Sequence, residues 1–157
     1  MEPTLRELTE RLISTGASRQ QVDDQCHMLY EMLKLICNSC PDLIWAKDMN
    51  GIFTHTNVMM CEKLLCCESG EPTGKNDMYF ANRERALHPE NPDWHTFGEG
   101  CVDSDAVVIK SRVAERFVEY GNVRGKYLRL DVHKAPIFLN GVMIGTVGSG
   151  RDITGVI

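Results

Sequence analysis

The sequence has 157 residues, of which 43% are hydrophobic and 25% are charged, and its formal net charge at pH 7 is −5. This length and composition are those of about one globular domain. The acidic balance argues against a surface for nucleic acid or for an anionic membrane, both of which favour clustered lysine and arginine. No apolar run approaches the ~18 residues of a membrane span, and the N-terminus does not have the pattern of a signal peptide. We therefore expect a cytoplasmic protein whose seven cysteines are reduced thiols.

Two amphipathic helices are expected at the N-terminus. The first carries leucines at helical spacing and ends at Gly16. The second opens with a capping box of Ser18 and Gln21 and must end by Pro41. Neither helix can bury its apolar stripe alone, so each is expected to pack on the domain or on a second copy of the chain. The residues expected to pair two copies are Leu29, Leu33 and Ile36.

The chain after Pro41 changes character and predicts a β-hairpin. Apolar runs at 43–46 and 52–56 flank a turn that contains Asn50-Gly51, two residues that tolerate positive φ. Asn57 is expected to cap the helix that follows.

The middle of the chain predicts short helices between loops. Residues 78–100 are polar and contain prolines, and Asp103, Ser104 or Asp105 is expected to open another helix through Lys110.

Three strands are expected in the last third of the chain, with Asn140-Gly141 as a second tight turn. Alternation predicts one face formed by Leu128, Leu130 and Val132 and an opposite face formed by Tyr127, Arg129, Asp131 and His133. Periodicity alone leaves open which face packs on the helices, and the richness in polar groups favours a cavity-facing His133. The order of elements predicts an α+β domain with one antiparallel sheet and helices on one face.

The segment GTVGSGRDIT at 145–154 is rich in glycine but fits neither of the phosphate-binding glycine patterns. Too few residues follow it for a crossover helix whose N-terminus would hold a phosphate. Small residues on a terminal strand instead predict that another group approaches the sheet closely.

The same segment resembles the end of PAS sensor domains, in which a strand ending in glycine is followed by GRDIT. SCPDLIWAKDMNGIFTHTN at 39–57 resembles the start of that family, and GKND at 74–77 resembles its Gly-Lys-x-Asp motif. Order and spacing agree from about residue 36 to residue 154, roughly three quarters of the chain. The resemblance implies a five-stranded antiparallel sheet with short helices over one face, preceded here by the amphipathic helices.

The resemblance also divides the chain. Residues 1–36 would be a helical extension for dimerisation or linkage, 37–154 the PAS domain and 155–157 the start of a linker to an effector. PAS domains are sensory or dimerisation modules, so a non-enzymatic homodimer is implied that regulates a histidine kinase or a diguanylate cyclase. The residues expected to couple the signal are Asp152, Ile153 and Thr154.

A small ligand in the PAS cavity is the expected signal, and its identity is left open. The candidate cavity residues are Trp45, Tyr79, Trp94, Arg116 and His133. The flavin-binding motif of the light-sensing subfamily is absent. Pro41 follows Cys37-Asn-Ser-Cys40 where a c-type haem needs histidine, which argues against that cofactor, while a b-type haem is not excluded.

Two other hypotheses remain at this point. Cys61, Cys66 and Cys67 lie close together and would serve a thiol redox or metal-binding protein, although fixed ligand spacing is missing. Alternatively, the chain is a dimerisation module with a filled core and no ligand. No catalytic residue and no metal-ligand set is predicted, because no triad order, nucleophile elbow or paired-carboxylate motif is present.

Overall fold

The computed structural model describes residues 7, 10 and 14–156, in two compact units, Met1–Ser39 and Cys40–Ile157. The first unit contains helix α2 (Arg19–Ser39). Its start has the expected capping box, because the Ser18 amide donates to Gln21 Oε1 at 2.7 Å and the Gln21 amide donates to Ser18 Oγ at 3.3 Å. The leucines expected to form an earlier helix lie outside the described residues. Among the described helices, none combines the length and the apolar character that crossing a membrane requires.

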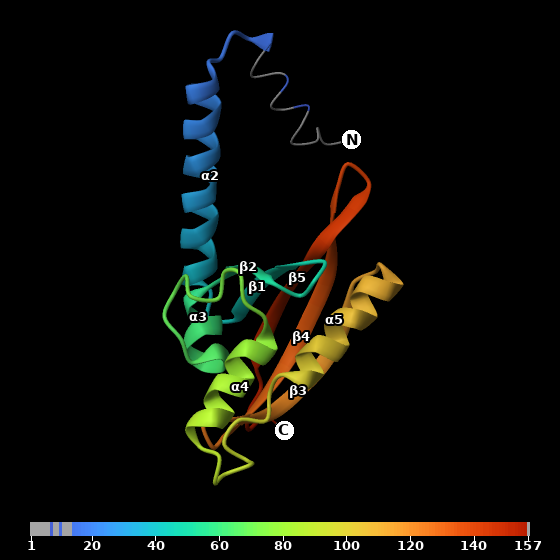
Figure 1. Ribbon diagram of the computed structural model, residues 1–157. Coiled ribbons are helices and arrows are strands. Elements are labelled where there is room, and N and C mark those ends of the chain that lie inside the picture. The colour runs from blue at the N-terminus through green and yellow to red at the C-terminus, as the bar shows by residue number, and fades with distance from the viewer. Residues whose placement is uncertain (1–6, 8–9, 11–13, 157) are drawn as a thin grey trace. The chain divides into compact units, whose positions relative to one another are not determined.

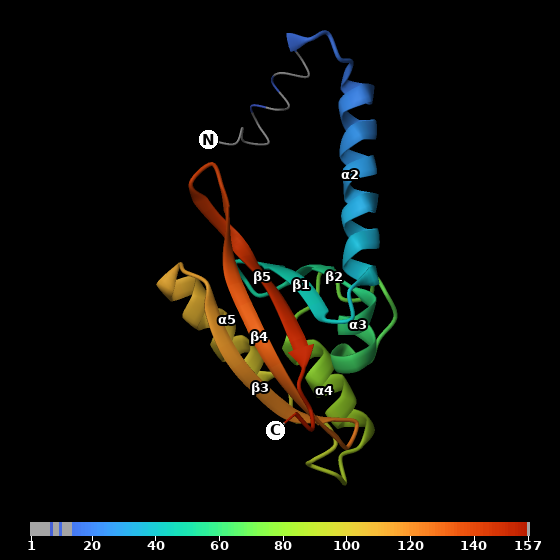
Figure 2. The same cartoon turned by 180° about the vertical axis from the view of Figure 1, so that it is seen from behind.

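The second unit contains a five-stranded antiparallel sheet in the order β2-β1-β5-β4-β3, so the last strand of the chain is central. Helices α3, α4 and α5 lie on one face of this sheet (Figure 1), and the view from behind shows its other face (Figure 2). The strands are β1 (Leu43–Asp48), β2 (Phe53–Thr56), β3 (Glu115–Val123), β4 (Lys126–Leu139) and β5 (Val142–Asp152). The helical elements are α3 (Val58–Met60), the π-helical segment η1 (Cys61–Leu65), α4 (Asp77–Leu87) and α5 (Glu99–Ser111).

The predicted α+β class and the predicted hairpins are confirmed. The first hairpin turn is held by Asp48, whose Oδ1 accepts from the amides of Asn50 and Ile52 at 2.8 and 2.9 Å. Asn57 caps α3 as expected, with its Oδ1 accepting from the Met60 amide at 3.0 Å.

Helix α5 begins at Glu99, earlier than the expected opening at Asp103–Asp105. The side chain of Arg85, on α4, explains this start. Arg85 donates to the Phe97 carbonyl at 3.1 Å and to both Glu99 carboxylate oxygens at 2.8 Å, which fixes the chain on both sides of Gly98. Gly98 itself has φ 137°, a conformation that favours glycine.

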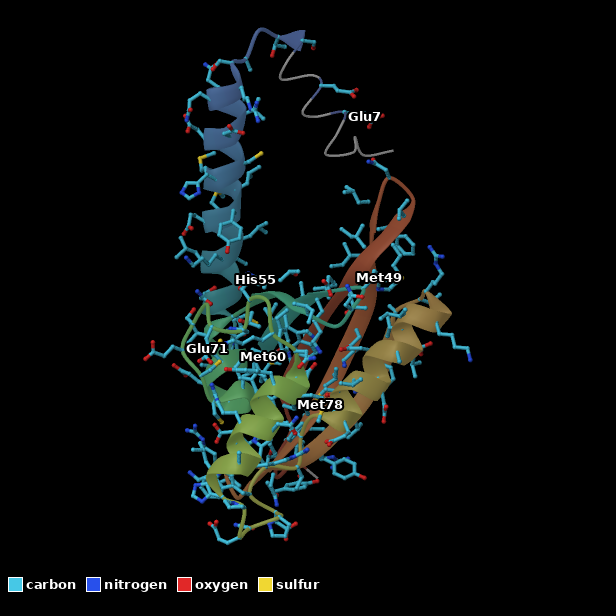
Figure 3. All side chains as sticks on the ribbon, in the orientation of Figure 1. Glu7, Met49, His55, Met60, Glu71 and Met78 are labelled. Atoms are coloured by element: carbon cyan, nitrogen blue, oxygen red, sulfur yellow. The ribbon has the colours of Figure 1, made fainter. Side chains whose placement is uncertain are left out.

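The core fills the layer between the sheet and its helices. Leu43, Leu130 and Val132 are fully buried on the sheet side. Met60, labelled in Figure 3, is buried on the helix side. The expected apolar face of β4 is therefore the face that packs on the helices.

The glycines of 145–154 make room for an indole. A Cβ atom added to Gly148 would lie 2.4 Å from ring atoms of Trp45, and one added to Gly150 would lie 3.5 Å from the same ring. Trp45 and Gly148 are partners in the β1–β5 pairing, so the indole lies against the backbone of β5. The predicted close approach to this strand is confirmed, and the approaching group is Trp45.

Candidate functional site

Two lysines project into the interior of the second unit. Strand alternation places Lys47 on the same face as Leu43 and Trp45, and Lys134 on the same face as Leu130 and Val132. Each lysine side chain is only 1% exposed. A buried ammonium requires charged partners, because leaving it unpaired in a low dielectric is costly.

The ammonium of Lys47 has two carboxylate partners. Lys47 Nζ donates to Asp77 Oδ2 at 2.5 Å and to Asp105 Oδ2 at 2.6 Å. Burial alone would lower the pKa of Lys47, but the two carboxylates outweigh burial and hold the pKa above its ordinary value. Lys47 is therefore a fixed positive charge that joins β1 to α4 and α5.

The ammonium of Lys134 has four acceptors within reach. It donates to Asp105 Oδ1 at 2.7 Å, to Ser104 Oγ at 2.6 Å and to the Cys101 carbonyl at 3.0 Å. Glu119 Oε1, on β3, lies 3.1 Å away. Asp105 thus bridges the two lysines, and we call Lys47, Asp77, Asp105, Glu119 and Lys134 the buried ionic network.

The ionic network borders a groove of about 490 Å³ between α5 and β3. Its polar floor is formed by Cys101, Ser104 and Glu119. The Ser104 hydroxyl donates to Glu119 Oε1 at 2.6 Å, and the Cys101 thiol donates to Glu119 Oε2 at 3.3 Å. Apolar side chains, among them Phe97 and Phe117, line much of the rest, together with the polar Thr96 and Asp103. An apolar groove with a few convergent polar groups is the usual form of a small-molecule site.

The structure does not bring the five expected cavity residues together. Trp45 is buried beside the network, with its ring centroid 5.7 Å from Lys134 Nζ, but it does not line the groove. Tyr79 is 46% exposed on α4. Trp94 lies in the loop before α5, where its ring centroid is 3.8 Å from that of His88.

Arg116 and His133 lie on the face of the sheet away from the helices. They are cross-strand partners, with side chains 67% and 63% exposed. The expectation of a cavity-facing His133 is wrong, because Val132 and Lys134 take the interior side of β4. The polar richness of this face has another explanation, since Arg116 makes two hydrogen bonds of 2.7 and 2.8 Å to Asp131.

The residues expected to pair copies or to couple the signal lie on exposed surfaces and at the end of β5. Leu29, Leu33 and Ile36 are 48%, 61% and 62% exposed on α2. Thr154 Oγ1 accepts from the Arg129 amide at 3.0 Å, and the Ile153 amide donates to the Arg129 carbonyl at 2.8 Å. The end of β5 is therefore tied to β4.

Two of the three clustered cysteines, Cys66 and Cys67, have poor properties for redox chemistry. Burial, and then the neighbouring Cys61, raise the pKa of Cys67 to about 12. Burial also raises the pKa of Cys66. A reactive cysteine needs a thiolate, which these environments disfavour. Within the described part of the chain, no group of three or more His, Cys, Asp or Glu side chains is placed to hold a metal ion.

The network residues were missed from the sequence although a signal for two of them was present. Continuing the alternation of Leu43 and Trp45 leads to Lys47, and continuing that of Leu130 and Val132 leads to Lys134. Asp77 is the aspartate of the GKND motif at 74–77. No sequence signal indicated that these groups meet across five elements.

Comparison with solved structures places this architecture among known folds. The chain resembles VqmA of Vibrio cholerae solved with a ligand and DNA, at 19% identity over 80% of this chain and 51% of that chain, with a TM-score of 0.61. It also resembles a PAS domain from Colwellia psychrerythraea, at 14% identity over 80% of this chain and 98% of that chain, with a TM-score of 0.57. The PAS domain of Bordetella pertussis BvgS matches at 16% identity over 82% of this chain and 87% of that chain, with a TM-score of 0.53.

The matches are structural ones. No family model and no curated protein matches the sequence. The chain spans about half of the VqmA chains, 50–58% of their length, and nearly all of the isolated PAS domain from Colwellia psychrerythraea. The five-stranded antiparallel sheet with helices on one face and these likenesses agree, and the chain has the fold of a PAS domain.

Proposed function

We propose that this chain is a sensory module that binds a small molecule in the groove between α5 and β3 and regulates an effector without catalysing a reaction itself. The observation that carries the proposal is the continuity between the groove floor and the buried ionic network. PAS-fold proteins that bind a ligand support it, since VqmA has been solved bound to DPO.

The network offers a route from the groove to the sheet. Glu119 touches the groove and contacts Lys134 on β4, which shares Asp105 with Lys47 on β1. A ligand that changes the partners of Glu119 would shift the equilibrium between two arrangements of these ionic contacts. It does so only if it binds one arrangement more tightly than the other. The proposed output is the end of β5 at Asp152 together with the two residues that follow it, Ile153 and Thr154.

A groove-filling substitution tests the ligand site. Val107 lines the groove and is 45% exposed, whereas Val113 is 55% exposed and lies outside it. In a thermal-shift screen of small metabolites, we expect at least one compound to raise the Tm of the wild type and of Val113→Trp, but not that of Val107→Trp. A compound that stabilises Val107→Trp equally would place the site elsewhere. A screen without any stabilising compound would favour the ligand-free dimerisation module.

We further propose that two copies pair through α2. Leu29, Leu33 and Ile36 recur at intervals of four and three residues, the spacing of a coiled-coil seam, and all are exposed. VqmA of Vibrio cholerae has been solved as a dimer. The double variant Leu29→Asp/Leu33→Asp should sediment as a folded monomer, and a variant that remains dimeric would place the pairing surface elsewhere.

We propose that the effector is joined to this module in the same polypeptide. The support is that the chain matches only about half of VqmA, a protein solved with DNA. The histidine kinase and diguanylate cyclase named above remain two proposals beside a DNA-binding effector of that kind.

A further inference from the structure

The ionisable side chains that line the groove are acidic. Asp103 and Glu119 line it, and no lysine, arginine or histidine does so among the described residues. Phe97 and Phe117 are aromatic residues of the same lining. The charged side chains of this lining attract a positive charge and repel an anion.

The nearest ammonium below the groove is not available to a ligand. Lys134 has three N–H donors, and the acceptors around it are Asp105, Ser104, the Cys101 carbonyl and Glu119. Four acceptors already compete for three donors. An anionic ligand would therefore find no donor on Lys134 without breaking an existing contact.

Glu119 is short of donors on one of its two oxygens. Oε1 accepts from the Ser104 hydroxyl at 2.6 Å and lies 3.1 Å from Lys134 Nζ. Among the described residues, Oε2 receives only the Cys101 thiol, at 3.3 Å, and a thiol is a weak donor. Burial, and then Glu119 itself, raise the pKa of Cys101 well above its usual value, so the sulfur stays a neutral thiol. A nearly buried carboxylate oxygen that accepts from one weak donor favours a ligand that brings a strong hydrogen-bond donor.

We propose that the ligand is a small monocationic amine with an aromatic or apolar body. Its ammonium pairs with Glu119 Oε2, and its body packs on Phe97 and Phe117 in the groove. This inference rests on the proposed ligand-binding function of the groove and specifies the chemistry of the ligand.

Two probes of similar size and opposite charge test the inference on the full chain. 2-Phenylethylamine and 3-phenylpropionate are titrated separately while amide NMR signals of α5 and β3 are followed. We expect the amine to shift signals of groove residues with an affinity at least ~10-fold higher than that of the carboxylate, as a charge-assisted hydrogen bond predicts. Equal or tighter binding of the carboxylate in the groove would overturn the amine assignment and leave the ligand site standing. If neither probe shifts groove signals, both the amine assignment and the proposed groove function fail.

Matched variants identify the pairing group. Glu119→Gln keeps the shape of the side chain but removes its charge, and it should lower the affinity for the amine at least ~10-fold. Asp103→Asn removes the other groove charge and should change that affinity less than ~3-fold, because Asp103 is exposed. A Glu119→Gln protein that binds the amine as tightly as the wild type contradicts the pairing. If this variant fails to fold by circular dichroism, the comparison of the two probes on the wild type still decides the charge of the ligand.

Discussion

Two parts of the same sheet face meet the helix layer in opposite ways. Over β5, Gly148 and Gly150 carry no side chain, and the indole of Trp45 lies directly on the backbone. Over β3, Glu119 and Ser104 form a polar floor below an open groove. Over β5 the space is filled by one rigid aromatic group, the indole of Trp45. Over β3 a groove remains open above the ionic network. We infer that the first part fixes the sheet and that the second part is where a bound molecule changes the interactions.

Removing one charge from the ionic network is expected to have the largest effect. Lys47→Met keeps the volume of the side chain but leaves Asp77 without its ammonium partner in the interior. Breaking a buried ion pair from one side costs about 3–5 kcal/mol, because the remaining charge stays buried without compensation. Urea unfolding monitored by circular dichroism measures this loss.

The control for Lys47→Met is an ion pair on the other face of the sheet. Arg116 also makes two short contacts to a carboxylate, that of Asp131, but its side chain is 67% exposed. Arg116→Ala should unfold at nearly the same urea concentration as the wild type, since water screens an exposed pair. A Lys47→Met protein as stable as Arg116→Ala would show that the interior does not depend on its charges.

The glycines of β5 give the second contrast, with a smaller effect. A Cβ at residue 148 would lie 2.4 Å from the Trp45 ring, so Gly148→Ala forces the indole to move and should cost about 1–3 kcal/mol. A Cβ at residue 150 would lie at an ordinary contact distance of 3.5 Å, so Gly150→Ala should stay within ~1 kcal/mol of the wild type. Thermal unfolding of the two variants measures the difference. Equal losses would mean that the tight contact at Gly148 does not limit the packing.

The elements of the sheet were predictable from the sequence because their signals are local. Asn50-Gly51 and Asn140-Gly141 occupy hairpin turns, with positive φ at both glycines and at Asn140. Alternating apolar residues in β4 identified the two faces of the strand. The choice between these faces was not local. It failed for His133 because polar groups on the outer face pair with Asp131: Arg116 from the neighbouring strand β3, and His133 from the same strand.

The candidate site was far less predictable. Its charged groups come from β1, α4, α5, β3 and β4, and contacts between such distant segments leave no mark on local periodicity. Alternation alone places Lys47 and Lys134 on the apolar face, but burial of a lysine is credible only when its carboxylates are known. Asp105 illustrates the difficulty, because the sequence marks it as a helix-opening residue whereas the structure buries it between two lysines.

The buried histidine His95 contrasts with the ionic network, because its surroundings favour the neutral form. His95 is 3% exposed, and its Nδ1 is buried without a hydrogen-bond partner in the described structure. Burial lowers the pKa of His95, and the neighbouring Arg85 and Arg124 lower it further, although Glu84 opposes them. The charges of the ionic network have compensating partners, whereas a protonated His95 would face three arginines, Arg83, Arg85 and Arg124, against one carboxylate, that of Glu84.

The smallest expected effect is therefore a dependence of stability on pH. Because the folded pKa of His95 lies below the ordinary value of 6.5, the unfolded chain takes up a proton that the folded chain does not. Stability should fall as the pH decreases through the unfolded pKa and level off below the folded pKa. Urea unfolding at pH 7.5 and pH 5.5 should show a smaller loss for His95→Asn than for the wild type, while His27→Asn, on the exposed surface of α2, should match the wild type. If His95→Asn loses as much stability as the wild type over this range, other groups carry the dependence and the interior accepts the additional charge.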